Sequence, residues 1–374
     1  MIPNDEMDRR WRLVRAAMAQ AGLDWLIASN GHPFGYGRWL TNRAQLGGPL
    51  VAMPIEGEVL LASHGDEVHT LAQDSYGVRH LVSCAQLNMM VNSHAPLLVA
   101  EMRRRPVRRI GLLGTGFIPV SSYLILKAAF PDAEITDATD LIAPIKAVKS
   151  AAEMVLMREA AAMHDMAVER ACNTVRAGIT ARDVLEEVRF AVNKLGSPAQ
   201  TFMAGSAPPG TICRYSGPLD RVMAPGDQFA MLLEGAQKDG YYSEAMPTIC
   251  IGDIPPALQK AFDETVEIQE QLAAMVRPGM LPAELLAAND AFMEARGYPR
   301  ELRLLGHSQG LDLVERPAFS PAGENLPIQH DMVISIHPTV HAPTAWGYPN
   351  NMSFHFTAAG ISRMLRTPQK IFVV

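Results

Sequence analysis

Two glutamates and two histidines in the second half of the chain are candidates for metal binding or catalysis. Glu234 and Glu244 lie on either side of a Lys-Asp-Gly turn in the stretch LEGAQKDGYYSE. His307 lies in LLGHSQG, and His337 follows the apolar run MVISI. Carboxylates and imidazoles bind metal ions, and imidazoles also exchange protons near neutral pH. The residue types therefore suit either a metal centre or acid–base catalysis.

Further polar candidates follow in the last part of the chain. His341 comes after a proline, and the stretch NNMSFHFT alternates, with Asn351 and His355 on one face and Met352 and Phe354 on the other. A strand with this pattern buries its apolar face, so the polar face meets water or lines a cavity. A single histidine on a strand is more often a hydrogen-bonded structural residue than a ligand.

Hydrophobic patterning predicts the elements that position these side chains. Strands and hairpins are expected over residues 201–252 and again beyond 303, with two helical stretches between them. Ser150 and Glu153 form the S-x-x-E pattern of a capping box, which predicts the start of a long helix that Gly178 ends.

The N-terminal part predicts a separate, smaller domain. A helix over residues 7–22 precedes the apolar strand DWLIAS, the loop NGHPFGYGRW and a hairpin formed by PLVAMPI and EVLLAS. RIGLLG and SSYLILKAAF continue an α/β pattern. We therefore expect an α/β domain over 1–145 and an α+β domain over 146–374.

Composition excludes several classes of protein. The 374 residues carry a net charge of -6, and no basic cluster favours nucleic acid or an anionic membrane. No long apolar run predicts a membrane span, and the N-terminus lacks a signal-peptide pattern. The cysteines form no C-x-x-C pair, which favours reduced thiols; they are Cys84, Cys172, Cys213 and Cys250. A cytoplasmic protein is expected.

The order of several motifs resembles the creatinase and proline-peptidase family, whose fold is called pita-bread. IKAVKSAAEMVLMREAAAM resembles its domain-joining segment, GDQFAMLLEGAQKDGYYSEAMPT its carboxylate hairpin, and LLGHSQGLDLVERP its GHG segment. DMVISIHPTVH resembles the later "GMVFTIEPGIY" pattern. The resemblance implies a curved antiparallel sheet covered by helices, preceded by a smaller creatinase-like domain.

Metal-dependent members of that family hold two ions with two Asp, one His and two Glu. Carried over by position, these become Leu233, Glu244, His307, His337 and Asn351. Leucine cannot bind a metal, and one carboxylate cannot offset the charge of two cations. The dinuclear centre is therefore expected to be absent. The neighbouring Glu234, of opposite parity to Leu233, is expected to face solvent.

Two interpretations of the altered site remain open. Glu244, His307 and His337 can hold a single divalent metal, or the site is metal-free, as in creatinase, and the same groups exchange protons. We favour the metal-free interpretation. The expected function is a non-peptidase hydrolase that cleaves a C–N bond in a small polar metabolite. Alternatives are a lyase, a mononuclear-metal enzyme, an Xaa-Pro peptidase and a non-catalytic binding module.

The resemblance also implies further site residues and a partner. The catalytic histidine of creatinase falls on Tyr215, which becomes a candidate proton donor, and His341, Asn351 and His355 become candidates for substrate binding. Family members are usually homodimers in which the N-terminal domain of one subunit reaches its partner's site. Arg38 and His32 of the loop NGHPFGYGRW are expected there, bound to an anionic group of a small-molecule substrate.

Overall fold

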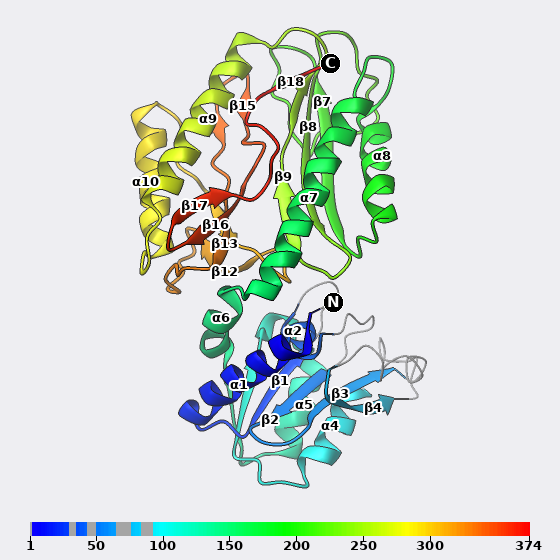
Figure 1. Cartoon of the computed structure of the whole chain (residues 1–374), viewed down its shortest axis with the longest axis vertical. Coiled ribbons are helices and arrows are strands. Elements are labelled where there is room, and N and C mark those ends of the chain that lie inside the picture. Colours follow the sequence, from blue (N-terminus) through cyan, green and yellow to red (C-terminus); the bar gives the residue numbers. More distant parts are fainter. Residues whose placement is uncertain (1, 30–34, 43–49, 65–75, 84–92) are drawn as a thin grey trace. The chain divides into compact units, whose positions relative to one another are not determined.

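The chain divides into two units, Met1–Lys146 and Ala147–Val374, which are drawn in Figure 1. The structure, a computed structural model, describes residues 2–29, 35–42, 50–64, 76–83 and 93–374. No helix among these residues is both long and apolar enough to cross a membrane.

A six-stranded mixed sheet forms the first unit, in the order β4-β3-β2-β1-β5-β6. The strands are β1 (Trp25–Ser29), β2 (Leu50–Pro54), β3 (Val59–His64), β4 (Val78–Ser83), β5 (Arg109–Leu113) and β6 (Glu134–Asp137). The helices are α1 (Asn4–Ala21), α2 (Tyr36–Thr41), α4 (His94–Met102), α5 (Val120–Ala129) and α6 (Thr139–Ala147). The antiparallel pairing of β2 with β3 confirms the predicted hairpin.

Helix α2 replaces part of the loop that the sequence predicts between β1 and β2. Its Trp39 and Leu40 are fully buried, the Arg10 guanidinium lies 5.1 Å from the Trp39 ring, and the Trp11 indole donates to the Leu40 carbonyl oxygen. Packing against α1 thus outweighs the glycine-rich composition of this stretch, because tertiary contacts override weak local preferences.

The second unit has two main sheets. One has the order β18-β10-β8-β7 with β9 paired to β8, and the other has the order β12-β11-β13-β16-β17. The strands of the first are β7 (Gln200–Ala207), β8 (Gln228–Ala236), β9 (Tyr242–Ala245), β10 (Thr248–Cys250) and β18 (Phe372–Val373). Those of the second are β11 (Gly306–Ser308), β12 (Glu315–Phe319), β13 (Met332–Ile336), β16 (Ser353–Thr357) and β17 (Gly360–Arg363). A short ribbon of β14 (Val340–His341) and β15 (Trp346–Gly347) completes the unit.

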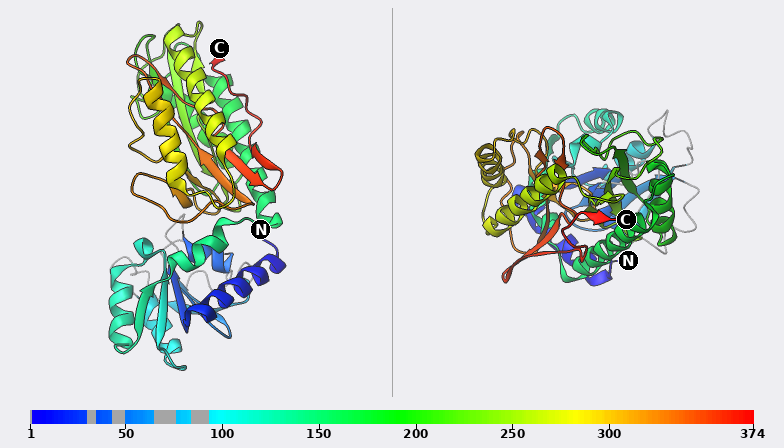
Figure 2. Two further views of the ribbon diagram at one scale, coloured as in Figure 1. Left: turned by 90° about the vertical axis from the view of Figure 1, so that its left-hand side faces the viewer. Right: turned by 90° about the horizontal axis from the view of Figure 1, so that it is seen from above.

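A pair of helices packs on each of the two sheets (Figures 1 and 2). Helices α7 (Ala151–Thr174) and α8 (Ala181–Lys194) contact β7, β8 and β9. Helices α9 (Pro256–Met275) and α10 (Pro282–Ala295) contact β12 to β15. A bridge between Ala245 and Asn351 joins the two sheets at their inner edge. The predicted α+β pita-bread arrangement is confirmed.

The long helix begins where the sequence predicts but ends earlier. Ser150 accepts from the backbone of Glu153, whose side chain accepts in return, which confirms the capping box. The helix ends at Thr174 and not at Gly178. Gly178 has a φ of 87° and donates its N–H to the Met223 carbonyl oxygen, so this glycine serves the following turn.

His164 makes the stability of this unit depend on pH. It is fully buried on α7, where Nδ1 lies 2.8 Å from the Ala160 carbonyl oxygen and the ring edge contacts Phe202. Burial lowers its pKa to about 4. In the unfolded chain the histidine pKa is near 6.5. Between about pH 6.5 and 4 the unfolded chain therefore binds a proton at this residue and the folded chain does not. Folding stability is therefore lost as the pH falls from about 6.5 towards 4.

Acidification should lower the free energy of unfolding by about 2 kcal/mol less in His164→Leu than in the wild type, because leucine does not bind a proton. Urea unfolding at pH 7.5 and pH 4.5 measures the free energy of unfolding of both proteins. For each protein, the value at pH 7.5 is the reference for the value at pH 4.5. An equal loss of stability in the two proteins would contradict the assignment.

Candidate metal centre

The register of one hairpin places two carboxylates side by side. Strands β8 and β9 pair antiparallel, with Glu234 directly opposite Glu244 and Leu233 opposite Ala245. Directly opposed residues point to the same face of a sheet. Leu233 and Ala245 therefore share the other face, where both belong to the apolar core beneath α7 and α8.

The expectation that Glu234 faces solvent is wrong. Glu234 lines a cavity together with Glu244, and burial raises its pKa to about 7. Leu233, at the position of a metal-binding Asp in the family, has an apolar side chain. The next residue, Glu234, places a carboxylate in the cavity. The symmetry of the hairpin about Asp239 would have revealed this, because it pairs residues 234 and 244.

His307 lies on β11, which is held tightly between its neighbours. Opposite it are Ala318 of β12 and Ser335 of β13. The strands approach so closely that a Cβ on Gly306 would lie 2.1 Å from the Ser335 carbonyl oxygen. Only glycine fits at residue 306, which fixes the backbone that carries the imidazole.

The hydrogen bonding of His307 determines which ring nitrogen faces the site. Nδ1 lies 3.0 Å from the Ser308 carbonyl oxygen, which can only accept, so the neutral ring carries its proton on Nδ1. Burial lowers the pKa of His307 to about 4, which keeps the ring neutral. Nε2 therefore presents a lone pair, the form that binds metals.

His337 follows β13 and is fixed through the backbone. The side-chain amide of Gln269, from α9, donates to the Ile336 carbonyl oxygen at 2.7 Å and to the Asn351 carbonyl oxygen at 3.0 Å. Burial, with the nearby His307 and Arg303, lowers the pKa of His337 to about 3. This second imidazole is therefore neutral as well.

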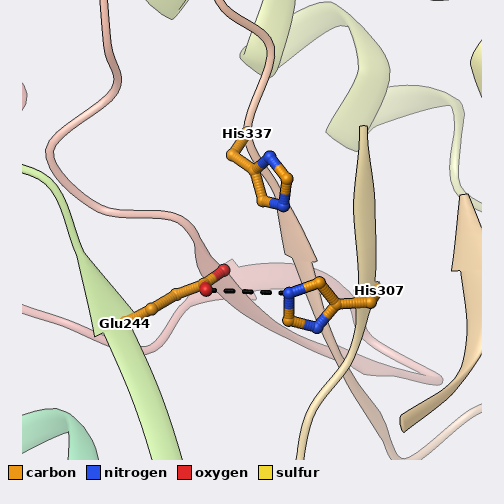
Figure 3. A group of neighbouring side chains, drawn as sticks. All are labelled: Glu244, His307 and His337. Atoms are coloured by element: carbon orange, nitrogen blue, oxygen red, sulfur yellow. Dashed lines mark ion pairs between the residues drawn. The ribbon is translucent and has the colours of Figure 1, made fainter. Parts of the chain in front are cut away.

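Glu244, His307 and His337 converge on one point (Figure 3). One ligand atom from each lies within 4.8 Å of the others. His307 Nε2 and Glu244 Oε2 are 3.7 Å apart, too far for a hydrogen bond and close to the roughly 3–3.5 Å that separates two ligands of one metal ion.

The charge state of Glu244 also favours a cation at this point. Its Oε1 is buried and has no hydrogen-bond partner among the described residues. Burial, reinforced by Glu234, raises the pKa of Glu244 well above its usual value. A buried carboxylate without a partner is costly, and a bound cation removes that cost. The three residues therefore fit a divalent metal.

The cluster opens onto a cavity of about 60 Å³. Acidic, basic, hydroxyl and apolar groups line it: Tyr215, Leu232, Glu234, Glu244, Met246, Arg303, His337, Thr339, Pro349 and Met352. The cavity thus brings Tyr215 next to the cluster, as the sequence predicts. Nothing in the sequence pattern marked Arg303, because it lies on a loop outside any strand or helix.

His341 and Asn351 are near the centre but do not line the cavity. The His341 ring lies against Trp346 with ring centroids 4.5 Å apart and the planes tilted by 41°. Asn351 donates through its side-chain amide to the Leu365 carbonyl oxygen at 2.7 Å. The residue predicted to replace a metal ligand therefore has its amide nitrogen engaged with the backbone.

His355 lies on the opposite face of β16 from the cavity. Met352, the residue before this strand, lines the cavity, and alternation from it turns the odd-numbered residues of the strand the other way. His355 instead lines a separate cleft with Arg158 and Arg363, which does not include the metal cluster. The sequence pattern separated the two faces correctly but assigned the site to the wrong one, because a helix, α7, covers the polar face.

The remaining predicted site residues belong to the first unit. Arg38 lies within α2, and His32 lies outside the described residues. The homodimer in which they would reach a partner's site stays a prediction.

Two family models match the chain. Residues 155–365 match the model described as metallopeptidase family M24, and residues 10–148 match the creatinase/prolidase N-terminal domain.

Several similar proteins are dipeptidases by name. The Xaa-Pro dipeptidase of Lactobacillus delbrueckii subsp. lactis is 25% identical over 230 residues, which cover 60% of this chain and 62% of that protein. "Probable dipeptidase PepE" of Mycobacterium bovis is 26% identical over 372 residues, 98% of this chain and 96% of that protein. The structure of an Xaa-Pro dipeptidase from Bacillus anthracis has a TM-score of 0.81 at 19% identity and covers 98% of this chain and 100% of that one.

These findings correct the function expected from the sequence. The expectation of a non-peptidase hydrolase that acts without a metal is wrong, because the family is described as metallopeptidases and relatives named for an activity include dipeptidases. Substitution at particular ligand positions does not by itself remove a chain from a metallopeptidase family. The chain belongs to metallopeptidase family M24 and carries that family's creatinase/prolidase N-terminal domain.

Proposed function

We propose that this chain is a hydrolase that cleaves the peptide bond of short peptides with one divalent metal ion held by Glu244, His307 and His337. The observation that carries the proposal is the convergence of these three donors beside the cavity. One carboxylate with two imidazoles is a ligand set that catalytic zinc sites use.

The charges around the cluster favour a single ion. Glu244 supplies one negative charge, and the two imidazoles are neutral. Glu234 is the other carboxylate that lines the cavity, so one divalent ion is balanced by two anions. A second divalent ion would bring two more positive charges without further carboxylates among the lining residues.

The chain's own side chains have separate roles in this proposal. A divalent ion supplies Lewis-acid chemistry, since it polarises a carbonyl oxygen and acidifies water. Glu234 lies beside the ligand Glu244 without binding in the three-residue cluster, and it accepts a proton from the attacking water. Tyr215 offers a hydroxyl on the cavity wall, which donates to the substrate.

Removal of one ligand should remove the metal. We expect about one zinc or manganese ion per wild-type chain and an affinity more than about 100-fold weaker in His307→Ala, which loses one of three donors. His355→Ala, a histidine outside the cavity, is the matched control and should keep the ion. Equilibrium dialysis followed by elemental analysis measures both; two ions per chain, or full retention by His307→Ala, would refute the single site.

Peptide hydrolysis should require both the metal and its anionic ligand. We expect the metal-loaded protein to hydrolyse alanyl-proline, a chelator to stop the reaction, and Glu244→Gln to lower kcat/KM by at least about 100-fold. The exposed Glu169, replaced by Gln, is the control for loss of a carboxylate elsewhere. Proline release measures the rate, and thermal unfolding confirms that each variant is folded. Activity that survives complete metal removal would contradict the proposal.

A further inference from the structure

Two buried asparagines join the sheets of the second unit. They are residues 350–351, which lie between β15 and β16 and which we call the connecting segment. Asn351 forms the bridge to Ala245, and the Asn350 carbonyl oxygen accepts the Met246 N–H at 3.0 Å. Ala245 and Met246 directly follow Glu244 in the chain. The connecting segment therefore holds the strand that carries the carboxylate ligand.

The same segment leads into the second sheet, which positions both imidazoles. Met352 follows the segment directly, and its carbonyl oxygen accepts the Ile336 N–H at 3.0 Å. Ile336 precedes His337, and His307 lies on β11, which pairs with β13 in this sheet. Glu244 lies in the other sheet. The distance from the carboxylate to the imidazoles therefore depends on the joint between the sheets, which includes the connecting segment.

One side chain from the stretch between β17 and β18 holds the connecting segment. Gln369 Oε1 accepts the backbone N–H groups of Asn350 and Asn351, at 2.7 and 3.3 Å. Gln369 Nε2 donates to the Asn351 carbonyl oxygen at 3.1 Å and to Gln269 Oε1, on α9, at 2.8 Å. Both ends of the amide are therefore engaged, and they tie the backbone of the connecting segment to a helix behind the second sheet.

Backbone groups of the same stretch bind the asparagine side chains. Asn350 Nδ2 donates to the Pro368 carbonyl oxygen at 2.9 Å, and Asn351 Nδ2 donates to the Leu365 carbonyl oxygen at 2.7 Å. These bonds orient the two side chains, whereas Gln369 bonds the backbone itself. The position of the connecting segment along the joint therefore depends on the Gln369 amide.

The ligand atoms leave little room for a shift of this joint. Glu244 Oε2 lies 3.7 Å from His307 Nε2, across the gap between the two sheets. A metal ion binds tightly when its ligands are held in place, and residues that orient ligands matter nearly as much as the ligands. A side chain that fixes the joint therefore acts on the metal through Glu244, without touching the ion.

We propose that Gln369 is a positioning residue of the metal centre, which keeps Glu244 at binding distance from the two imidazoles by holding the connecting segment. The inference rests on the proposed function, because that function assigns the three ligands. Gln369 does not line the cavity. Loss of its amide should therefore weaken metal binding although every ligand and every lining residue is retained.

The first measurement is the zinc affinity, by competition with a chelator. Gln369→Met removes the hydrogen bonds and keeps the length of the side chain, and we expect it to weaken zinc binding by about 10- to 100-fold. Gln369→Asn keeps an amide that is one methylene shorter and should lose less. Gln228→Met is the matched control, because this buried glutamine donates to two backbone carbonyl oxygens, both at 3.3 Å, and does not line the cavity. It should keep the wild-type affinity.

The second measurement separates positioning from a merely structural role. The visible absorption bands of bound cobalt(II) report the number and arrangement of its ligands. We expect these bands to change in Gln369→Met and to match the wild type in Gln228→Met. Thermal unfolding of the metal-free proteins measures stability. A structural role alone would lower the stability of Gln369→Met and leave the zinc affinity and the cobalt bands unchanged.

The outcomes distinguish this inference from the proposed function. Wild-type zinc affinity and cobalt bands in folded Gln369→Met overturn the role of Gln369 and leave the proposed function standing. Weaker zinc binding and altered bands support that role even if the wild type cleaves no peptide, a result that would refute only the peptidase activity. A wild type that binds neither ion overturns both. If Gln369→Met does not fold, Gln369→Asn provides the same comparison.

Discussion

The antiparallel register of β8 and β9 is the constraint on which the site depends. It sets Glu234 opposite Glu244 and turns Leu233 into the core. A slip of one residue would exchange the two faces, placing a carboxylate in the apolar core beneath α7 and leucine in the cavity. Burial of an unpaired charge costs several kcal/mol, so the hydrophobic core itself enforces the position of the acidic pair.

The ligand set that results differs in charge from the one the family resemblance implies. Metal-dependent relatives implied by the resemblance use four carboxylates and one histidine, whereas the cluster here contains one carboxylate and two neutral imidazoles, as the sequence predicts, with Glu234 beside them. Imidazoles bind divalent ions without offsetting their charge, so an ion here would polarise a bound oxygen more strongly than one surrounded by carboxylates. Fewer anions thus suit fewer metal ions, which agrees with the single ion proposed for this member of the family.

Much of the fold and the centre of the site could be predicted from the sequence. The alternating strands, the capping box at Ser150 and the order of motifs gave the architecture and the three residues Glu244, His307 and His337. The errors about the site share one cause. The position of a residue in a motif does not show which side chains strand pairing and helix packing bring into the cavity. Motif position led to Leu233 and missed Glu234, which the hairpin register places opposite Glu244. Strand alternation at His355 does not say which face a helix covers. Hydrogen bonds to Glu301 and Thr339 hold the Arg303 guanidinium at the cavity wall. The periodicity of the sequence does not reveal these contacts.

Gln269 connects the site to the outer layer of the domain. Its side-chain amide donates to the carbonyl oxygen of Ile336, which precedes a proposed ligand, and to that of Asn351, which forms the bridge between the sheets. A side chain of helix α9 therefore holds the backbone that leads into His337. Substitutions along the buried side of α9 would therefore act on the position of the imidazole while every residue that lines the cavity stays unchanged.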